Sequence, residues 1–80
     1  MNEIAEIDAQ LYPNPATESF NIKGVNEIEK VFVYSAEGKL MIESEYQYGN
    51  AVSVDHLNPG VYFVKMKSGS VYKTVKLIKK

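Results

Sequence analysis

Residues that could perform acid–base, nucleophilic or metal chemistry are few in this chain of 80 residues. Glu43 and Glu45 lie two positions apart, so in a strand their carboxylates share one face and could act as an acid–base pair. We favour a simpler interpretation, in which they form a solvated strand face that discourages edge-to-edge association. His56 is the only histidine, and without nearby Cys, His or paired carboxylates it is interpreted as a surface residue. The sequence therefore predicts that the chain is not an enzyme.

Aromatic residues are the other candidates for binding. Tyr46 and Tyr48 alternate on one predicted strand face, where their rings could stack on a sugar, although tyrosines that complete a small core are the more common case. Phe63 and Tyr72 are predicted to be exposed on neighbouring strands. A calcium site needs several oxygen ligands, and besides Asn14 only Asp8 and Glu18 lie close in sequence. We expect no metal and no cofactor.

Composition excludes several further classes. The net charge of −1 provides no long-range field that would attract nucleic acid. The chain has no cysteine, so it has neither disulfides nor thiolate metal sites. Its longest apolar runs are far shorter than the ~20 residues that a transmembrane helix needs. Residues 1–8 are acidic, lack the apolar region of a signal peptide, and are expected to be a linker or the remnant of a longer protein, before a domain at residues 9–80.

Hydrophobic alternation and regular turn residues predict short antiparallel strands throughout the chain. The expected strands are residues 9–12, 18–22, 29–35, 40–48, 51–54, 61–68 and 71–80. Pro13 and Pro15 end the first of these strands. Gly38 is expected to have a positive φ in a turn. Pro59 and Gly60 suit the two central positions of a type II turn, in which the glycine has φ > 0.

The pattern predicts an all-β fold, a compact antiparallel sandwich of about seven strands with no helix. Its predicted core consists of Phe20, Val31, Val33, Leu40, Ile42, Val52, Val54, Leu57, Tyr62, Val64, Val75 and Leu77. Met66 is also expected to point inward. Because so short a chain buries only about 60–65% of its unfolded surface, this core is thin.

Four motifs in this order resemble a known family. The stretch "LYPNPATESFNI" resembles the opening of the type IX secretion system C-terminal sorting domain, type A, of Bacteroidetes cargo proteins. "VFVYSAEGKLM" resembles its Gly-Lys hairpin, "VSVDHLNPGVYFVKM" its apolar–turn–Gly-Val-Tyr segment, and "KTVKLIKK" its basic terminal strand. The resemblance covers residues 11–80.

The resemblance implies a small immunoglobulin-like β-sandwich that targets a larger N-terminal cargo across the outer membrane. It implies as partners the type IX translocon, an outer-membrane shuttle protein and a sortase-like protease that usually removes the domain, leaving the cargo on the cell surface or outside the cell. The motif residues that we expect to form the signal are Pro13, Asn14, Pro15, Gly38, Lys39, Leu57, Gly60, Tyr62, Lys76, Leu77, Ile78, Lys79 and Lys80. We expect the turns, and the unpaired backbone groups and side chains of the terminal strand, to be accessible to a receptor.

Two alternatives remain open from the sequence. One is a non-catalytic immunoglobulin-like or fibronectin-like binding module that holds a glycan through Tyr46 and Tyr48. The other is a structural stalk or adhesion repeat. A sorting domain is expected to occur once, at the end of its parent protein, whereas a stalk repeat is expected to recur in tandem.

Overall fold

A computed structural model describes residues 9–24, 28–47 and 49–80, and these residues form strands and turns without a helix. The predicted boundary that assigns residues 1–8 to a linker lies outside the described residues. The strands are β1 (Ala9–Tyr12), β2 (Ser19–Gly24), β3 (Lys30–Ser35), β4 (Leu40–Glu45), β5 (Val52–Ser53), β6 (Gly60–Ser68) and β7 (Val71–Lys79). The predicted all-β class is confirmed.

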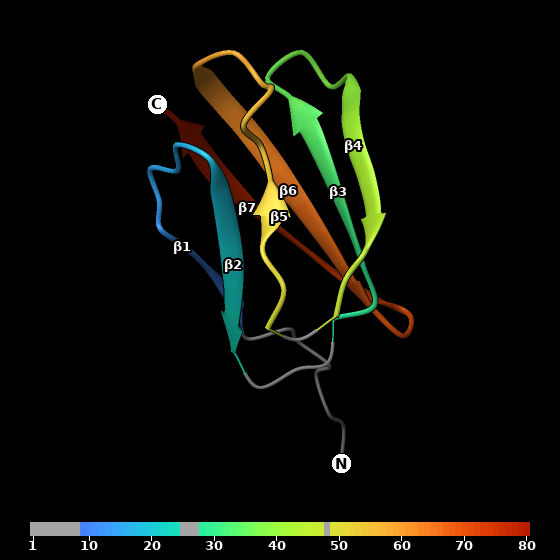
Figure 1. Cartoon of the computed structure of the whole chain (residues 1–80). Coiled ribbons are helices and arrows are strands. Elements are labelled where there is room, and N and C mark those ends of the chain that lie inside the picture. The colour runs from blue at the N-terminus through green and yellow to red at the C-terminus, as the bar shows by residue number, and fades with distance from the viewer. Residues whose placement is uncertain (1–8, 25–27, 48) are drawn as a thin grey trace.

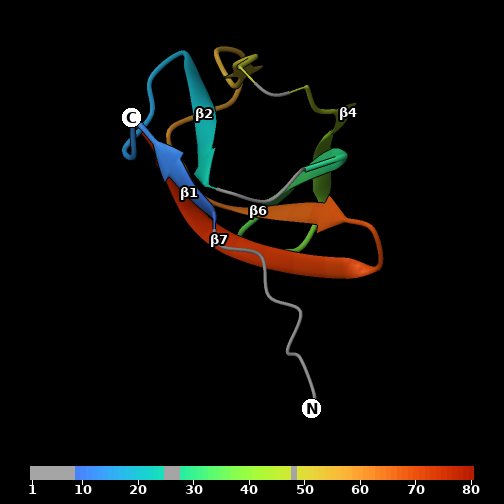
Figure 2. The ribbon, with the colours of Figure 1, turned by 90° about the horizontal axis from the view of Figure 1, so that it is seen from below.

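The seven strands form two facing sheets (Figure 1). One sheet has the order β1-β2-β5 and the other β4-β3-β6-β7, and every pair of neighbouring strands is antiparallel. Seen from below, β1 of the first sheet lies along β7 of the second, so the sandwich is closed on that side (Figure 2). This arrangement confirms the predicted β-sandwich.

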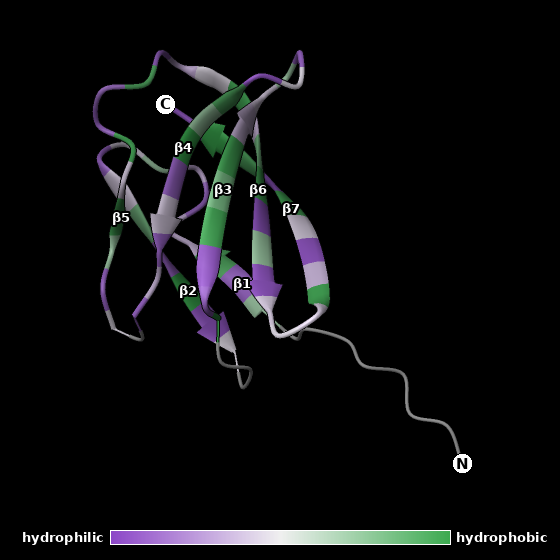
Figure 3. Ribbon diagram, turned by 90° about the vertical axis from the view of Figure 1, so that its right-hand side faces the viewer, coloured by the Kyte–Doolittle hydropathy of each residue, from purple (hydrophilic) through white to green (hydrophobic). Residues whose placement is uncertain are grey.

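The core lies between the sheets and is built from the inward positions of alternating strands. Figure 3 shows hydrophobic and hydrophilic residues alternating along β6 and β7. Most predicted core residues are buried, namely Phe20, Val31, Val33, Val52, Val54, Leu57, Tyr62, Val64 and Leu77, as is Met66. Ile42 and Val75 are partly buried and pack against this cluster. The predicted core omitted several further buried residues, namely Ala9, Leu11, Ala16, Ile22, Ile28 and Tyr46.

The prediction that Leu40 belongs to the core is wrong, because Leu40 is 42% exposed. Strict alternation would place it on the same face as Ile42. However, Ile42 pairs with Val33 whereas Leu40 pairs with the next residue, Tyr34, so β4 carries one extra residue at this point. Such a bulge shifts the residues beyond it by one position and turns Leu40 to the outer face. The strand expected over residues 40–48 also ends early, at Glu45.

Candidate functional site

The Pro-Asn-Pro motif is hydrogen bonded to the last strand. Asn14 Nδ2 donates to the carbonyl of Lys76, and Asn14 Oδ1 accepts from the amide of Ile78, each at 3.0 Å. Ala16 continues this contact, since its amide donates to the carbonyl of Ile78 and its carbonyl accepts from the amide of Lys80, both at 2.8 Å. The side chain of Asn14 and the backbone of Ala16 thus act together as a short strand beside β7. We call these four hydrogen bonds the clasp.

The prediction that the backbone groups of the terminal strand are unpaired is wrong for the carbonyls of Lys76 and Ile78 and for the amide of Ile78, because the clasp binds them. As the outermost strand of its sheet, β7 would otherwise leave the outward N–H and C=O groups of its C-terminal half unpaired, and such edges promote association. The sequence analysis identified Asn14 as a residue of the signal motif and predicted no contact with β7. Its actual partners are more than sixty residues away, and no local pattern predicts such a contact.

The second motif is the turn that leads into β6. The hydroxyl of Tyr62 donates to the carbonyl of Asn58 at 2.6 Å, and Leu57 is buried beneath the turn. Gly60 has a φ of +154°, so the predicted positive φ is confirmed. The value differs from the φ of about +80° that a type II turn requires at this position. Gly60 instead already pairs with Lys79 as the first residue of β6.

The third motif is the hairpin between β3 and β4. Ser35 organises it, because its Oγ accepts from the amide of Lys39 at 3.1 Å and from the amide of Glu37 at 3.3 Å. Its backbone amide also donates to the carbonyl of Lys39 at 2.8 Å. Gly38 has a φ of +92°, as the sequence predicted. The side chain of Lys39 is exposed beyond this turn.

All four motifs meet at one end of the sandwich, which we call the motif end (Figure 1). The strand registers require this arrangement. Ala16 and Gly60 both pair with Lys79, and Ser35, the last residue of β3, pairs with Tyr62. The hairpin that joins β6 to β7 lies at the opposite end (Figure 1). Motifs that are widely separated in sequence therefore form one continuous surface region.

The predicted signal residues divide into exposed and buried groups. The exposed residues are Pro13, Asn14, Pro15, Gly38, Lys39, Gly60, Lys76, Ile78 and Lys80. Leu57, Tyr62 and Leu77 are buried and belong to the hydrophobic core at the motif end. The expectation that every side chain of the terminal strand is accessible is wrong for Leu77 and for Lys79, which is only 8% exposed. The Lys79 side chain lies on the inward face of β7, and its Nζ donates to the main-chain oxygen of Lys80 at 3.2 Å.

The candidate catalytic residues do not come together. Glu43, Glu45 and His56 are all exposed, and no group of three His, Asp or Glu side chains suited to a metal occurs within the described part of the chain. Glu43 forms an ion pair with Lys30 at 2.9 Å, and this hydrogen bond raises the pKa of Lys30. These contacts match the predicted solvated strand face.

A second ion pair lies at the end of the sheet remote from the motif end. Glu29 accepts from Lys67 Nζ at 3.2 Å, and this hydrogen bond lowers the pKa of Glu29. The side chains of Lys67 and Glu29 are 31% and 56% exposed, so the pair is open to solvent and adds little to stability. In the stretches 9–24, 28–47 and 49–80, no helix is long and apolar enough to cross a membrane.

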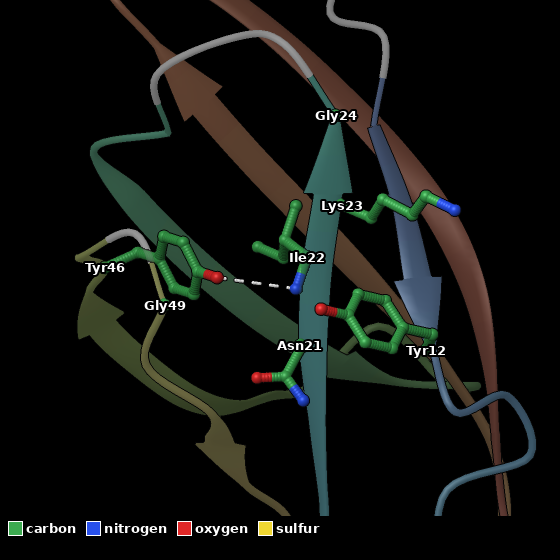
Figure 4. A pocket seen from close by; sticks show the side chains of 7 residues that line it. All are labelled: Tyr12, Asn21, Ile22, Lys23, Gly24, Tyr46 and Gly49. Atoms are coloured by element: carbon green, nitrogen blue, oxygen red, sulfur yellow. Dashed lines mark hydrogen bonds between the residues drawn. The ribbon is translucent and has the colours of Figure 1, made fainter.

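The alternative of a sugar platform formed by Tyr46 and Tyr48 is not supported. Tyr46 is only 8% exposed, and its hydroxyl oxygen accepts from the amide of Ile22 at 3.4 Å. Tyr46 and Tyr12 line an open depression of about 190 Å³ and lie on opposite sides of β2 (Figure 4). Tyr48 lies outside the described residues. Tyr46 thus packs in the core and binds the amide of Ile22, at a part of β2 that does not pair with β5. A tyrosine that completes the core is the alternative that the sequence favoured.

Comparison with known proteins agrees with the motif order. The family model described as "Secretion system C-terminal sorting domain" matches residues 10–80. The match begins within β1 and extends through the last residue of β7, so it includes all four motifs of the motif end. A search of curated proteins finds no match to the chain.

Proposed function

Because the chain belongs to the family of C-terminal sorting domains of the type IX secretion system, we propose that the secretion machinery recognises the motif end. Membership makes the chain a sorting signal that directs export to the cell surface or the extracellular space. The alternatives of a glycan-binding module or an adhesion repeat are not supported.

One observation carries the proposal. The four family motifs, which the sequence spreads from Pro13 to Lys80, converge on a single end of the sandwich, where the clasp joins the first motif to the last. Signal recognition needs a surface of defined shape, and the exposed residues of this end, among them Asn14, Lys39 and Lys76, are held on rigid turns and strands. The buried motif residues Leu57 and Leu77 fix that shape.

We propose three partners for this domain, namely the translocon, an outer-membrane shuttle protein and a sortase-like protease. The folded domain comprises residues 9–80 and follows a linker that includes residues 1–8. The protease cuts on the N-terminal side of β1, since a backbone paired within a sheet is a poor substrate whereas an exposed linker is a good one. The cargo then remains at the cell surface or is released.

A secretion assay tests the proposed function. The full chain is fused to the C-terminus of a reporter that carries its own inner-membrane signal, and the fusion is expressed in a bacterium with the type IX machinery. The reporter is expected at the cell surface or in the medium, and in the periplasm of an isogenic strain without the translocon. Periplasmic retention in both strains would refute the proposal.

A further inference from the structure

Six apolar side chains form a row across the outer face of the four-stranded sheet, next to the motif end. We call these residues the apolar row: Tyr34, Leu40, Met41, Val61, Phe63 and Ile78. The registers make the row continuous, because Leu40 pairs with Tyr34, and Tyr34 with Phe63. Val61 pairs with Ile78 on the last two strands.

The apolar row is exposed for structural reasons. The bulge in β4 places Leu40 beside Met41 on the outer face, and alternation along β6 places Val61 and Phe63 opposite the buried Tyr62 and Val64. Tyr34 is half-buried, and the other five side chains are 36–42% exposed. A cluster of this kind on a small domain is typical of an interaction site, whereas single exposed apolar residues are ordinary.

Positive charge dominates the β6–β7 side of the apolar row, whereas Glu37 in the β3–β4 turn and Glu43 on the outer face of β4 lie near its other side. Residues 60–80, which form β6 and β7, contain six lysines and no acidic residue, whereas the rest of the chain contains three lysines and all ten acidic residues. Lys76 pairs with Phe63 and is exposed within the row, and Lys39 is exposed in the adjoining turn. The net charge of −1 conceals this segregation.

We infer that the apolar row is the docking surface for a partner protein whose own apolar patch is bordered by carboxylates. This inference rests on the proposed function and deepens it, since it assigns a partner chemistry to the face beside the motif end. The partner's apolar side chains cover Val61, Phe63 and Ile78, and its carboxylates pair with Lys76 and Lys39. Electrostatic complementarity of this kind selects the partner and speeds association.

Charge and shape argue against two other occupants. A second copy of this chain docked on the same face would oppose the lysines of β6 and β7 to each other, and like charges disfavour such an interface. The row also offers little apolar surface for insertion into a lipid layer, because its five most exposed side chains are each only 36–42% exposed.

Two variants of the full reporter fusion test the inference through export. Val61→Thr, Phe63→Thr and Ile78→Thr together remove the apolar surface and keep strand-forming residues. Lys76→Glu reverses one exposed charge and leaves the apolar surface intact. The matched controls are Tyr72→Thr, on the outer face of β7 away from the row, and Lys23→Glu, on the other sheet. Each row variant is expected to reduce surface reporter at least tenfold, with unchanged strand content by circular dichroism, whereas the controls are exported normally.

Crosslinking identifies the occupant. Phe63→p-benzoylphenylalanine in the exported fusion is expected to yield a protein adduct on irradiation, and this adduct is lost with Lys76→Glu. Tyr72→p-benzoylphenylalanine is expected to yield no such adduct. An adduct of two fusion chains, or binding of the purified chain to phosphatidylglycerol vesicles that Phe63→Thr abolishes, would overturn the inference in favour of a second copy or a membrane.

The export assay distinguishes a wrong proposed function from a wrong docking surface. If the unaltered fusion is not exported, the proposed function is wrong. If the unaltered fusion and both row variants are exported equally well, only the docking surface is wrong. If Lys76→Glu is not exported but the triple variant is, the apolar side chains are dispensable. This result would contradict the apolar part of the inference.

Discussion

Asn14 Oδ1 accepts a hydrogen bond from the amide of Ile78 at 3.0 Å, so the first motif of the chain binds the backbone of its last strand. The same amide side chain also donates to the carbonyl of Lys76. Both contacts are made by groups of β7 that point away from β6, and they join the two ends of the domain. The conformation of the terminal strand therefore depends on residues near the start of the domain.

Asn14→Ala is expected to loosen the terminal strand without unfolding the domain. The variant loses two exposed hydrogen bonds, which at about 0.5–1.5 kcal/mol each lowers the free energy of unfolding by about 1–3 kcal/mol. Hydrogen exchange should accelerate at the amide of Ile78. Asn50→Ala, a change of the same kind at another exposed asparagine, serves as the control. Equal stability of both variants would show that the clasp contributes nothing.

Tyr62→Phe is expected to destabilise the turn before β6. It removes the 2.6 Å hydrogen bond to the carbonyl of Asn58, which costs about 1 kcal/mol. Tyr46→Phe removes a longer bond, 3.4 Å to the amide of Ile22, and should cost less. Chemical denaturation measures the loss of stability in both variants, and we expect the larger loss for Tyr62→Phe. A larger loss for Tyr46→Phe would contradict the assigned role of Tyr62.

A pair of charge substitutions tests which side chains face inward. Val64 is fully buried, so Val64→Asp buries an unpaired carboxylate and should unfold the domain. Leu40→Asp should leave the domain folded, because the bulge in β4 turns this position outward. Far-UV circular dichroism and thermal melts distinguish the two. An unfolded Leu40→Asp variant would mean that the position is part of the core.

Gly60→Val is expected to lower stability by roughly 1–3 kcal/mol through backbone strain. The φ of Gly60 is +154°, and a Cβ added there would meet no atom within 4 Å, so crowding does not contribute. Gly24 lies at an exposed strand position and is not one of the glycines with a positive φ. Gly24→Val therefore controls for the change of residue type. Similar melting temperatures for both variants would remove the strain argument.

The fold was largely predictable from the sequence because alternation and turn residues are local signals. They identified all seven strands and most of the core, including Phe20 and Val64. Alternation predicted the wrong face for Leu40, because β4 carries one extra residue at this point. The amino-acid composition of the strand does not indicate such a bulge.

The site was predictable only as separate motifs. Their convergence depends on which strands pair, and the bonds of Asn14 to β7 span most of the chain. Lys79 was misjudged because lysine is rarely buried. Its position on the inward face of β7, following Val75 and Leu77, was the signal that could have corrected this.

Export of a fusion with an altered motif end tests the central claim most directly. Lys76→Gln with Lys80→Gln removes the two exposed charges of the terminal strand and spares the buried Lys79. Lys23→Gln with Lys67→Gln removes two charges outside the four motifs, because Lys67 lies at the end of the sheet remote from the motif end. The measured quantity is the fraction of reporter at the cell surface or in the medium of a type IX-competent strain. We predict that the first variant melts like the unaltered domain but is retained in the periplasm, whereas the second is exported. Normal export of the first variant would contradict recognition through the motif end.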